Sequence, residues 1–212
     1  MGFRTGFVLS SLSFLAGVLF ICAQYDHPLI FHAWSDAAPV RAERFYLGLY
    51  AAPRAVHALL HGMIALGIVG LLAKLHRWTE TAKWFDGAAL VFFMGCVGLY
   101  GVVIVPNLRL LANPTSMRLL ERSSIATQRA TLAAEAAAGR LDPSLVPTGP
   151  LQPDEGVAAL RIVAASNTLI LGLFAGVALM LVAEYYVEKE ERRMLEAARE
   201  AEMKELKVQK GQ

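Results

Sequence analysis

Charged residues are scarce in this sequence. Of its 212 residues, 18% are charged and 56% are hydrophobic, whereas a soluble domain usually carries about 25% charged residues. Four blocks of about twenty residues contain no charge at all, and that is the length a helix needs to cross a bilayer core of roughly 30 Å. This distribution excludes an ordinary soluble domain and predicts an all-α membrane protein.

Cysteine is equally rare, and the net charge is low. The two cysteines, Cys22 and Cys96, each lie within an apolar block, which is typical of buried thiols rather than of a disulfide framework. The net charge of +2 is too small to indicate binding to nucleic acid. We therefore expect no partner of that class.

The four apolar blocks cover residues 6–24, 55–73, 87–105 and 162–183. Backbone amides cannot stay unpaired in hydrocarbon, so such blocks form helices, and the alternation that marks a membrane β-barrel is missing. Residues 21–23 resemble a signal-peptide cleavage site, but the first block is longer than the usual apolar core of about 7–15 residues. We predict a four-span membrane domain over residues 1–186 that lies in the lipid bilayer.

The segments outside the spans differ in composition. Residues 106–161 form a long loop, in which the alanine-rich part 116–138 favours a surface helix. Four prolines make the part 141–154 irregular. The tail, residues 187–212, is highly charged and has acidic and basic residues spaced for pairing along a helix. We expect this tail to continue the fourth span as a helix.

An even number of spans places both termini on one side of the membrane. Near the spans, eight Lys and Arg residues lie on the side of the termini and six lie on the opposite side. Basic residues are enriched on the cytoplasmic side of membranes. This small bias favours cytoplasmic termini.

Two histidines, His57 and His61, lie four residues apart in the second span and share a helix face. That spacing can bind zinc if further ligands are present, but no carboxylate is expected inside another span. The metalloprotease pattern, with a glutamate between the histidines, is also absent. Hydrogen bonds between helices explain the pair more simply, so we expect no metal and no cofactor.

A polar row opens the fourth span at Ser166, Asn167 and Thr168. Such side chains are costly inside a membrane unless they are paired. Gly172 and Gly176 follow in a GxxxG pattern, on which another helix can approach closely. This face either packs internally against the first three spans or binds helices of a client protein. These five residues are the candidate site.

Small residues also recur in two other spans, which suits close helix packing. They are Gly6, Ser10, Ser13 and Gly17 in the first span and Gly95, Gly98 and Gly101 in the third span. No nucleophile–base pair, carboxylate dyad or phosphate-binding glycine loop stands out. A transporter would need ionisable groups near the membrane midplane. The sequence thus disfavours an enzyme and a transporter.

Short strings in all four spans resemble one protein family. They are GVLF (17–20), YDHPLIF (25–31), GIVGL (67–71), FDGAAL (85–90), AASNT (164–168) and YVEK (186–189). In this order they resemble the Shr-three family, which are fungal packaging chaperones of the endoplasmic reticulum for amino-acid permeases. The long loop and most of the tail lie outside the resemblance.

The resemblance implies a non-enzymatic, multi-pass resident of the endoplasmic-reticulum membrane. Such a protein would keep newly inserted amino-acid permeases from aggregating and help to load them into secretory vesicles. Its membrane domain would bind the permeases, and its cytoplasmic tail would contact vesicle-coat components. Ser166 and Asn167 suit this role, because they could shield unmet hydrogen-bonding groups of a client. An accessory structural subunit of a membrane complex is the alternative.

Overall fold

A computed structural model describes residues 3–31, 37–76 and 79–210 of the chain. Its elements are α1 (Phe3–Phe31), α2 (Ala37–Tyr50), α3 (Arg54–Leu75), α4 (Glu80–Gly98), the π-helix η1 (Leu99–Ile104), α5 (Val105–Ala112), α6 (Met117–Leu120), α7 (Ser124–Ala137), the 3₁₀ turn η2 (Pro143–Leu145) and α8 (Pro153–Lys210). Across these described ranges every regular element is helical, and four helical segments are long and apolar enough to cross a membrane. The predicted all-α membrane fold with four spans is confirmed.

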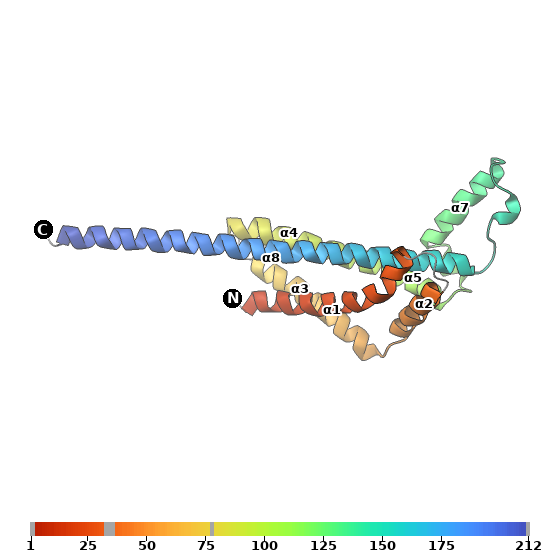
Figure 1. The fold of residues 1–212 in the computed structure, drawn as a ribbon, viewed down its shortest axis with the longest axis horizontal. Helices are drawn as coiled ribbons and strands as arrows, with labels where there is room; N and C mark the ends of the chain where they lie inside the picture. Colours follow the sequence, from red (N-terminus) through yellow and green to blue (C-terminus); the bar gives the residue numbers. More distant parts are fainter. Residues whose placement is uncertain (1–2, 32–36, 77–78, 211–212) are drawn as a thin grey trace.

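The four spanning segments lie side by side in one bundle (Figure 1). Helix α8 packs against both α1 and α4, and α3 packs against α1 and α4. Apolar side chains from the spans, among them Val8, Phe93 and Val177, form the shared core. The N-terminus lies at the end of the bundle where α8 leaves it (Figure 1). We call this the tail end and the opposite end the far end.

Close packing of α3 onto its neighbours depends on two glycines near the tail end. A Cβ atom on Gly67 would lie 2.5 Å from both Phe93 and Ser11, and one on Gly70 would lie 2.8 Å from Val8. The sequence predicted small-residue contacts at other positions, with a mixed outcome. A Cβ atom on Gly176 would lie 3.1 Å from Phe92 and one on Gly95 would lie 3.5 Å from Leu173, so these two face a neighbouring helix. Cβ atoms at four other predicted positions would meet nothing within 4 Å: Gly6, Gly17, Gly98 and Gly101. The tightest approach occurs in the second span.

The first half of α3 is packed much more loosely than the second half. Residues 54–66 include no buried residue, whereas Gly67, Gly70, Leu71 and Lys74 in the second half are buried. In Figure 1 the start of α3 diverges from α4 and α8. The bundle is consequently closed at the tail end and splayed at the far end.

The helix that contains the predicted third span, residues 87–105, continues through η1 and α5 to Ala112. Proline normally breaks a helix because it lacks an N–H and its ring clashes with the preceding turn. Here the π-helix comes just before Pro106, and the Val105 N–H already bonds to the carbonyl of Tyr100, five residues back. Asn107 Nδ2 donates to the Val103 carbonyl at 2.8 Å. The wider turn and this side-chain bond let the helix pass the proline.

The long loop carries the predicted surface helix, which is α7, and one side chain fastens it to α8. Arg129 donates from Nε and Nη2 to the two carboxylate oxygens of Glu155, at 2.6 and 2.7 Å. It also donates to the carbonyls of Gly149 and Pro150, at 2.8 and 3.0 Å. This two-pronged pairing is the strong form of an arginine–carboxylate contact. It ties α7 and the proline-rich segment to the first turn of α8.

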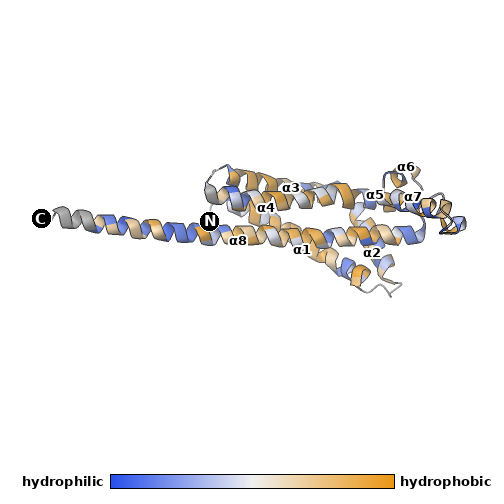
Figure 2. Cartoon of the chain, turned by 90° about the horizontal axis from the view of Figure 1, so that it is seen from above, coloured by the Kyte–Doolittle hydropathy of each residue, from blue (hydrophilic) through white to orange (hydrophobic). Residues whose placement is uncertain are grey.

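Helix α8 runs for 58 residues, from the far end through the bundle and out past the tail end. Figure 2 shows the change from an apolar bundle to a largely hydrophilic extension. Exposed ion pairs join Arg192 to Glu188 at 3.8 Å and Arg193 to Glu190 at 2.9 Å along this extension. The predicted helical, charged tail is confirmed.

Candidate functional site

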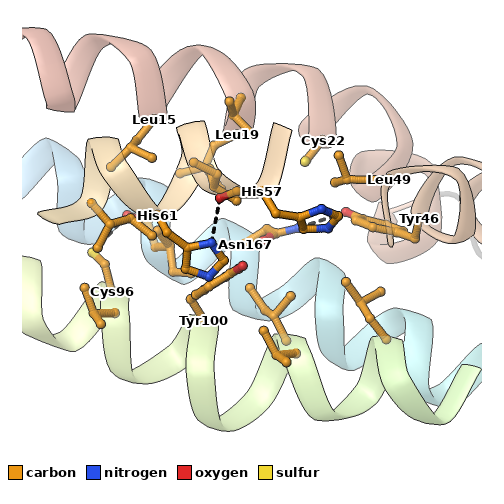
Figure 3. A pocket seen from close by; sticks show the side chains of 18 of the residues that line it. Leu15, Leu19, Cys22, Tyr46, Leu49, His57, His61, Cys96, Tyr100 and Asn167 are labelled. Atoms are coloured by element: carbon orange, nitrogen blue, oxygen red, sulfur yellow. Dashed lines mark hydrogen bonds between the residues drawn. The ribbon is translucent and has the colours of Figure 1, made fainter. Parts of the chain in front are cut away.

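A cavity of about 300 Å³ lies in the far-end half of the bundle, where α3 splays away from the third span. Its walls come from α1, α2, α3, the continuous run of α4, η1 and α5, and α8 (Figure 3). Most lining side chains are apolar: Leu15, Leu19, Leu60, Ile64, Phe93, Ile104, Ile170 and Phe174. We call this cavity the side groove.

Polar side chains also line the side groove: Tyr46, Tyr50, His57, His61, Tyr100, Arg109 and Asn167. The His61 Nδ1 atom lies 2.6 Å from the His57 carbonyl, one turn back (Figure 3). A carbonyl only accepts, so Nδ1 carries the hydrogen and Nε2 of the neutral ring is left as an acceptor. The rings of His61 and Tyr100 meet edge to face at 5.9 Å. The predicted histidine pair therefore faces a cavity wall on the π-helix.

The floor of the groove is a buried hydrogen-bond network from three helices. Asn167 Nδ2, on α8, donates to Asp26 of α1 at 2.9 Å and to the hydroxyl of Tyr46 of α2 at 2.8 Å. The Tyr46 hydroxyl donates in turn to the other oxygen of Asp26. Both carboxylate oxygens of Asp26 are thus satisfied, as a buried carboxylate requires. This network fixes α1, α2 and α8 relative to one another.

The structure separates the five residues of the predicted site. Ser166 and Asn167 are buried, and the Ser166 hydroxyl donates to the Ile162 carbonyl of its own helix at 2.8 Å. Gly176 packs against Phe92, whose ring would lie 3.1 Å from an added Cβ. Thr168 and Gly172 are exposed on α8. The site thus divides into an internal part and an outward-facing part.

A second buried polar cluster joins three spans at the tail end. The Lys74 ammonium of α3 donates to Glu184 of α8 and lies 2.7 Å from Asp86 Oδ1 of α4. The side chains of Lys74 and Asp86 are 1% and 0% exposed. Asp86 has no further hydrogen-bond partner among the residues that the structure describes. An ion cluster this deep holds the three helices in one register.

The carboxylates of these clusters lie just outside the predicted spans, so the expectation that no carboxylate lies inside another span stays a prediction. Asp26, Asp86 and Glu184 stand at the margins of the apolar blocks, where the sequence suggests an exposed flank, yet all three are buried. Asp86 and Glu184 lie at the edges of the third and fourth apolar blocks, and the oppositely charged Lys74 lies at the edge of the second. This arrangement is the signal that could have revealed the tail-end cluster. Tyr46 of α2 offered no comparable signal.

The two cysteines are free and buried, as predicted. Within the described part of the chain, no group of three or more His, Cys, Asp or Glu side chains is placed to hold a metal ion. The side chains that line the side groove offer apolar contact, hydrogen bonds and the charge of Arg109.

The family comparison covers the whole chain. The model of the Shr3 chaperone family, described as ER membrane protein SH3, matches residues 1–212. Comparisons with curated proteins and with solved structures found no match. The loop of residues 106–161 and the tail, which showed no resemblance of their own, fall within the match. The chain belongs to the Shr3 family of chaperones in the endoplasmic-reticulum membrane.

Proposed function

We propose that this chaperone assists the folding and vesicle packaging of amino-acid permeases, without catalysing a reaction itself. The observation that carries the proposal is the side groove, an apolar cavity with a few polar groups in the membrane domain of a chaperone-family protein. A permease that has not finished folding exposes hydrogen-bonding groups to lipid, where no water can satisfy them. A groove that offers both apolar contact and hydrogen bonds shields such groups until the client folds.

The strength of these contacts suits reversible binding. Hydrogen bonds between helices in membranes average about 0.6 kcal/mol, which is weak enough for a client to leave once its own helices have paired. Thr168 and Gly172 are exposed on α8 but do not line the groove, so they would offer a second contact face to a client helix. Ser166, Asn167 and Gly176 support this face from within.

The tail is the part that we assign to the vesicle-coat components. It continues α8 beyond the bundle, it is charged, and its side chains are exposed as far as they are described. Its position implies cytoplasmic termini, because coat proteins assemble on the cytoplasmic face. The small excess of basic residues on this side supports the same orientation.

Deletion of the gene, followed by localisation of each amino-acid permease, tests the proposal. We expect selective retention of permeases in the endoplasmic reticulum. Rescue with Ile64→Trp, which fills the groove, should fail, whereas Val91→Trp, at an exposed position on α4 that does not line the groove, should restore export. Normal permease export in the deletion strain would refute the function. A stable stoichiometric complex with one partner would instead favour an accessory structural subunit.

A further inference from the structure

Several polar groups on the wall of the side groove lack side-chain partners, whereas Asn167 and Tyr46 are bonded in the buried network. His57, Tyr100 and the Nε2 atom of His61 have no hydrogen bond to any side chain that the structure describes. His57 lies near the start of α3, but His61 is seven residues into the helix, roughly 10 Å along it, and so lies within the span. Polar groups without partners are expensive at that depth. The groove is therefore incomplete without an occupant that supplies hydrogen bonds.

The chemistry of the wall defines what kind of group fits. His61 Nε2 is an acceptor, the Tyr100 hydroxyl can donate, and His57 offers one donor and one acceptor as a neutral ring. A matching group must both donate and accept. A cation would find no free carboxylate here, because both oxygens of Asp26 are already bonded to Tyr46 and Asn167, and it would also meet Arg109. A carboxylate side chain on a client helix would be costly inside the membrane. The match is a neutral side chain such as a carboxamide or a hydroxyl.

The surroundings of the wall indicate how this group arrives. The first half of α3 has no buried residue, so its groove-facing side is open to a neighbouring helix. The cavity of about 300 Å³ has room for side chains but not for a whole helix, whose diameter is about 10–12 Å. A client helix would thus lie along the opening and insert side chains. Most of the rest of the lining is apolar and suits the other residues of such a helix.

We propose that the side groove recognises a client transmembrane helix by an amide or hydroxyl side chain in its far-end half, which His57, His61 and Tyr100 bind. This inference rests on the proposed chaperone function and specifies which segments the chaperone selects. Helices that are apolar throughout would not be preferred clients.

Binding of synthetic helices to the full-length protein tests this directly. The protein is reconstituted in phosphatidylcholine vesicles, and energy transfer measures its affinity for labelled Leu/Ala transmembrane peptides. One peptide carries a single Gln a third of the way across, and the other is entirely apolar. At about threefold per hydrogen bond, we expect the Gln peptide to bind roughly three- to tenfold more tightly.

Variants of the lining residues show whether the preference for the Gln peptide depends on the polar side chains of the cavity or on its shape. Replacement of all three groups, by His57→Leu, His61→Leu and Tyr100→Phe, should abolish the preference, and Tyr100→Phe alone, which removes one hydroxyl, should reduce it about threefold. Leu60→Met, at an apolar position of the same cavity, should keep it. Thermal unfolding of each variant shows whether the fold is retained, and the single variant gives a readout even if the triple variant unfolds.

Two results would overturn the inference. Equal affinity for the two peptides would mean that the polar side chains of the side groove do not bind a polar group of the client, or that lipid headgroups occupy the groove. A preference that survives in Tyr100→Phe and in the folded triple variant would place recognition elsewhere. Because permease export is measured in cells, either result leaves the proposed function standing if deletion still traps permeases.

Discussion

Replacement of Lys74 by methionine should be among the most damaging single changes in the bundle. Methionine keeps the length of the side chain but removes the ammonium group that Asp86 and Glu184 share. Asp86 is fully buried and has no other hydrogen-bond partner among the described residues, so its charge would be left uncompensated. Breaking a buried ion pair by removing one partner typically costs about 3–5 kcal/mol. We expect a loss of that size in the free energy of unfolding.

The measurement is SDS-induced unfolding of purified protein in detergent micelles, followed by tryptophan fluorescence. Lys204→Met, at an exposed tail position outside the bundle, is the matched control and should change stability by less than about 0.5 kcal/mol. A variant with apolar residues at all three positions (Lys74→Met, Asp86→Leu and Glu184→Met) should recover most of the loss, because no charge stays buried. If Lys74→Met and Lys204→Met unfolded alike, the burial argument for the cluster would be refuted.

Three further changes test other contacts in the same assay or by proteolysis. Gly67→Ala places a methyl group against two neighbouring spans and should lower the free energy of unfolding by about 1–3 kcal/mol. Gly17→Ala, whose methyl group meets nothing, should cost no stability. Equal effects of the two changes would contradict the packing described for α3. Asn167→Leu removes a hydrogen-bond donor from the buried carboxylate of Asp26 and should lower the free energy of unfolding by about 1–3 kcal/mol. Thr168→Val, on the exposed side of α8, should change it little. A larger loss for Thr168→Val than for Asn167→Leu would rule out the network as described. Arg129→Met should free α7 from α8 and speed proteolysis in the long loop, while unfolding of the membrane domain stays unchanged; an unaltered cleavage rate would show that the arginine does not hold the loop.

The sequence was sufficient to predict the number of spans and the class of the fold. Runs of apolar residues long enough to cross a bilayer leave few alternatives, because the backbone must satisfy its own hydrogen bonds there. The ends of the helices were less predictable. Pro106 is a sound reason to end a helix, but the π-helix that precedes it depends on packing that composition does not reveal.

The candidate site was predictable only in part. Asn167 was recognised as a polar residue that needs a partner, but its partners come from α1 and α2, more than 100 positions away in the sequence. Lys74 and Asp86 flank a short connection and resemble ordinary loop charges until the helices are assembled. The opening beside α3 was not predicted. His57 and His61 mark the first half of that helix, but the sequence does not show which helices pack against each half.

The unbroken course of α8 makes the membrane domain and the tail one mechanical piece. An α-helix turns about 100° and rises 1.5 Å with each residue, so the 24 residues from Val187 to Lys210 extend roughly 36 Å beyond the lipid-facing part. Removing a single residue after Glu184 would leave the groove intact and yet swing every tail side chain by about 100° around the axis. A soluble protein that docks on one side of the tail would then meet a different surface, at nearly the same height above the membrane.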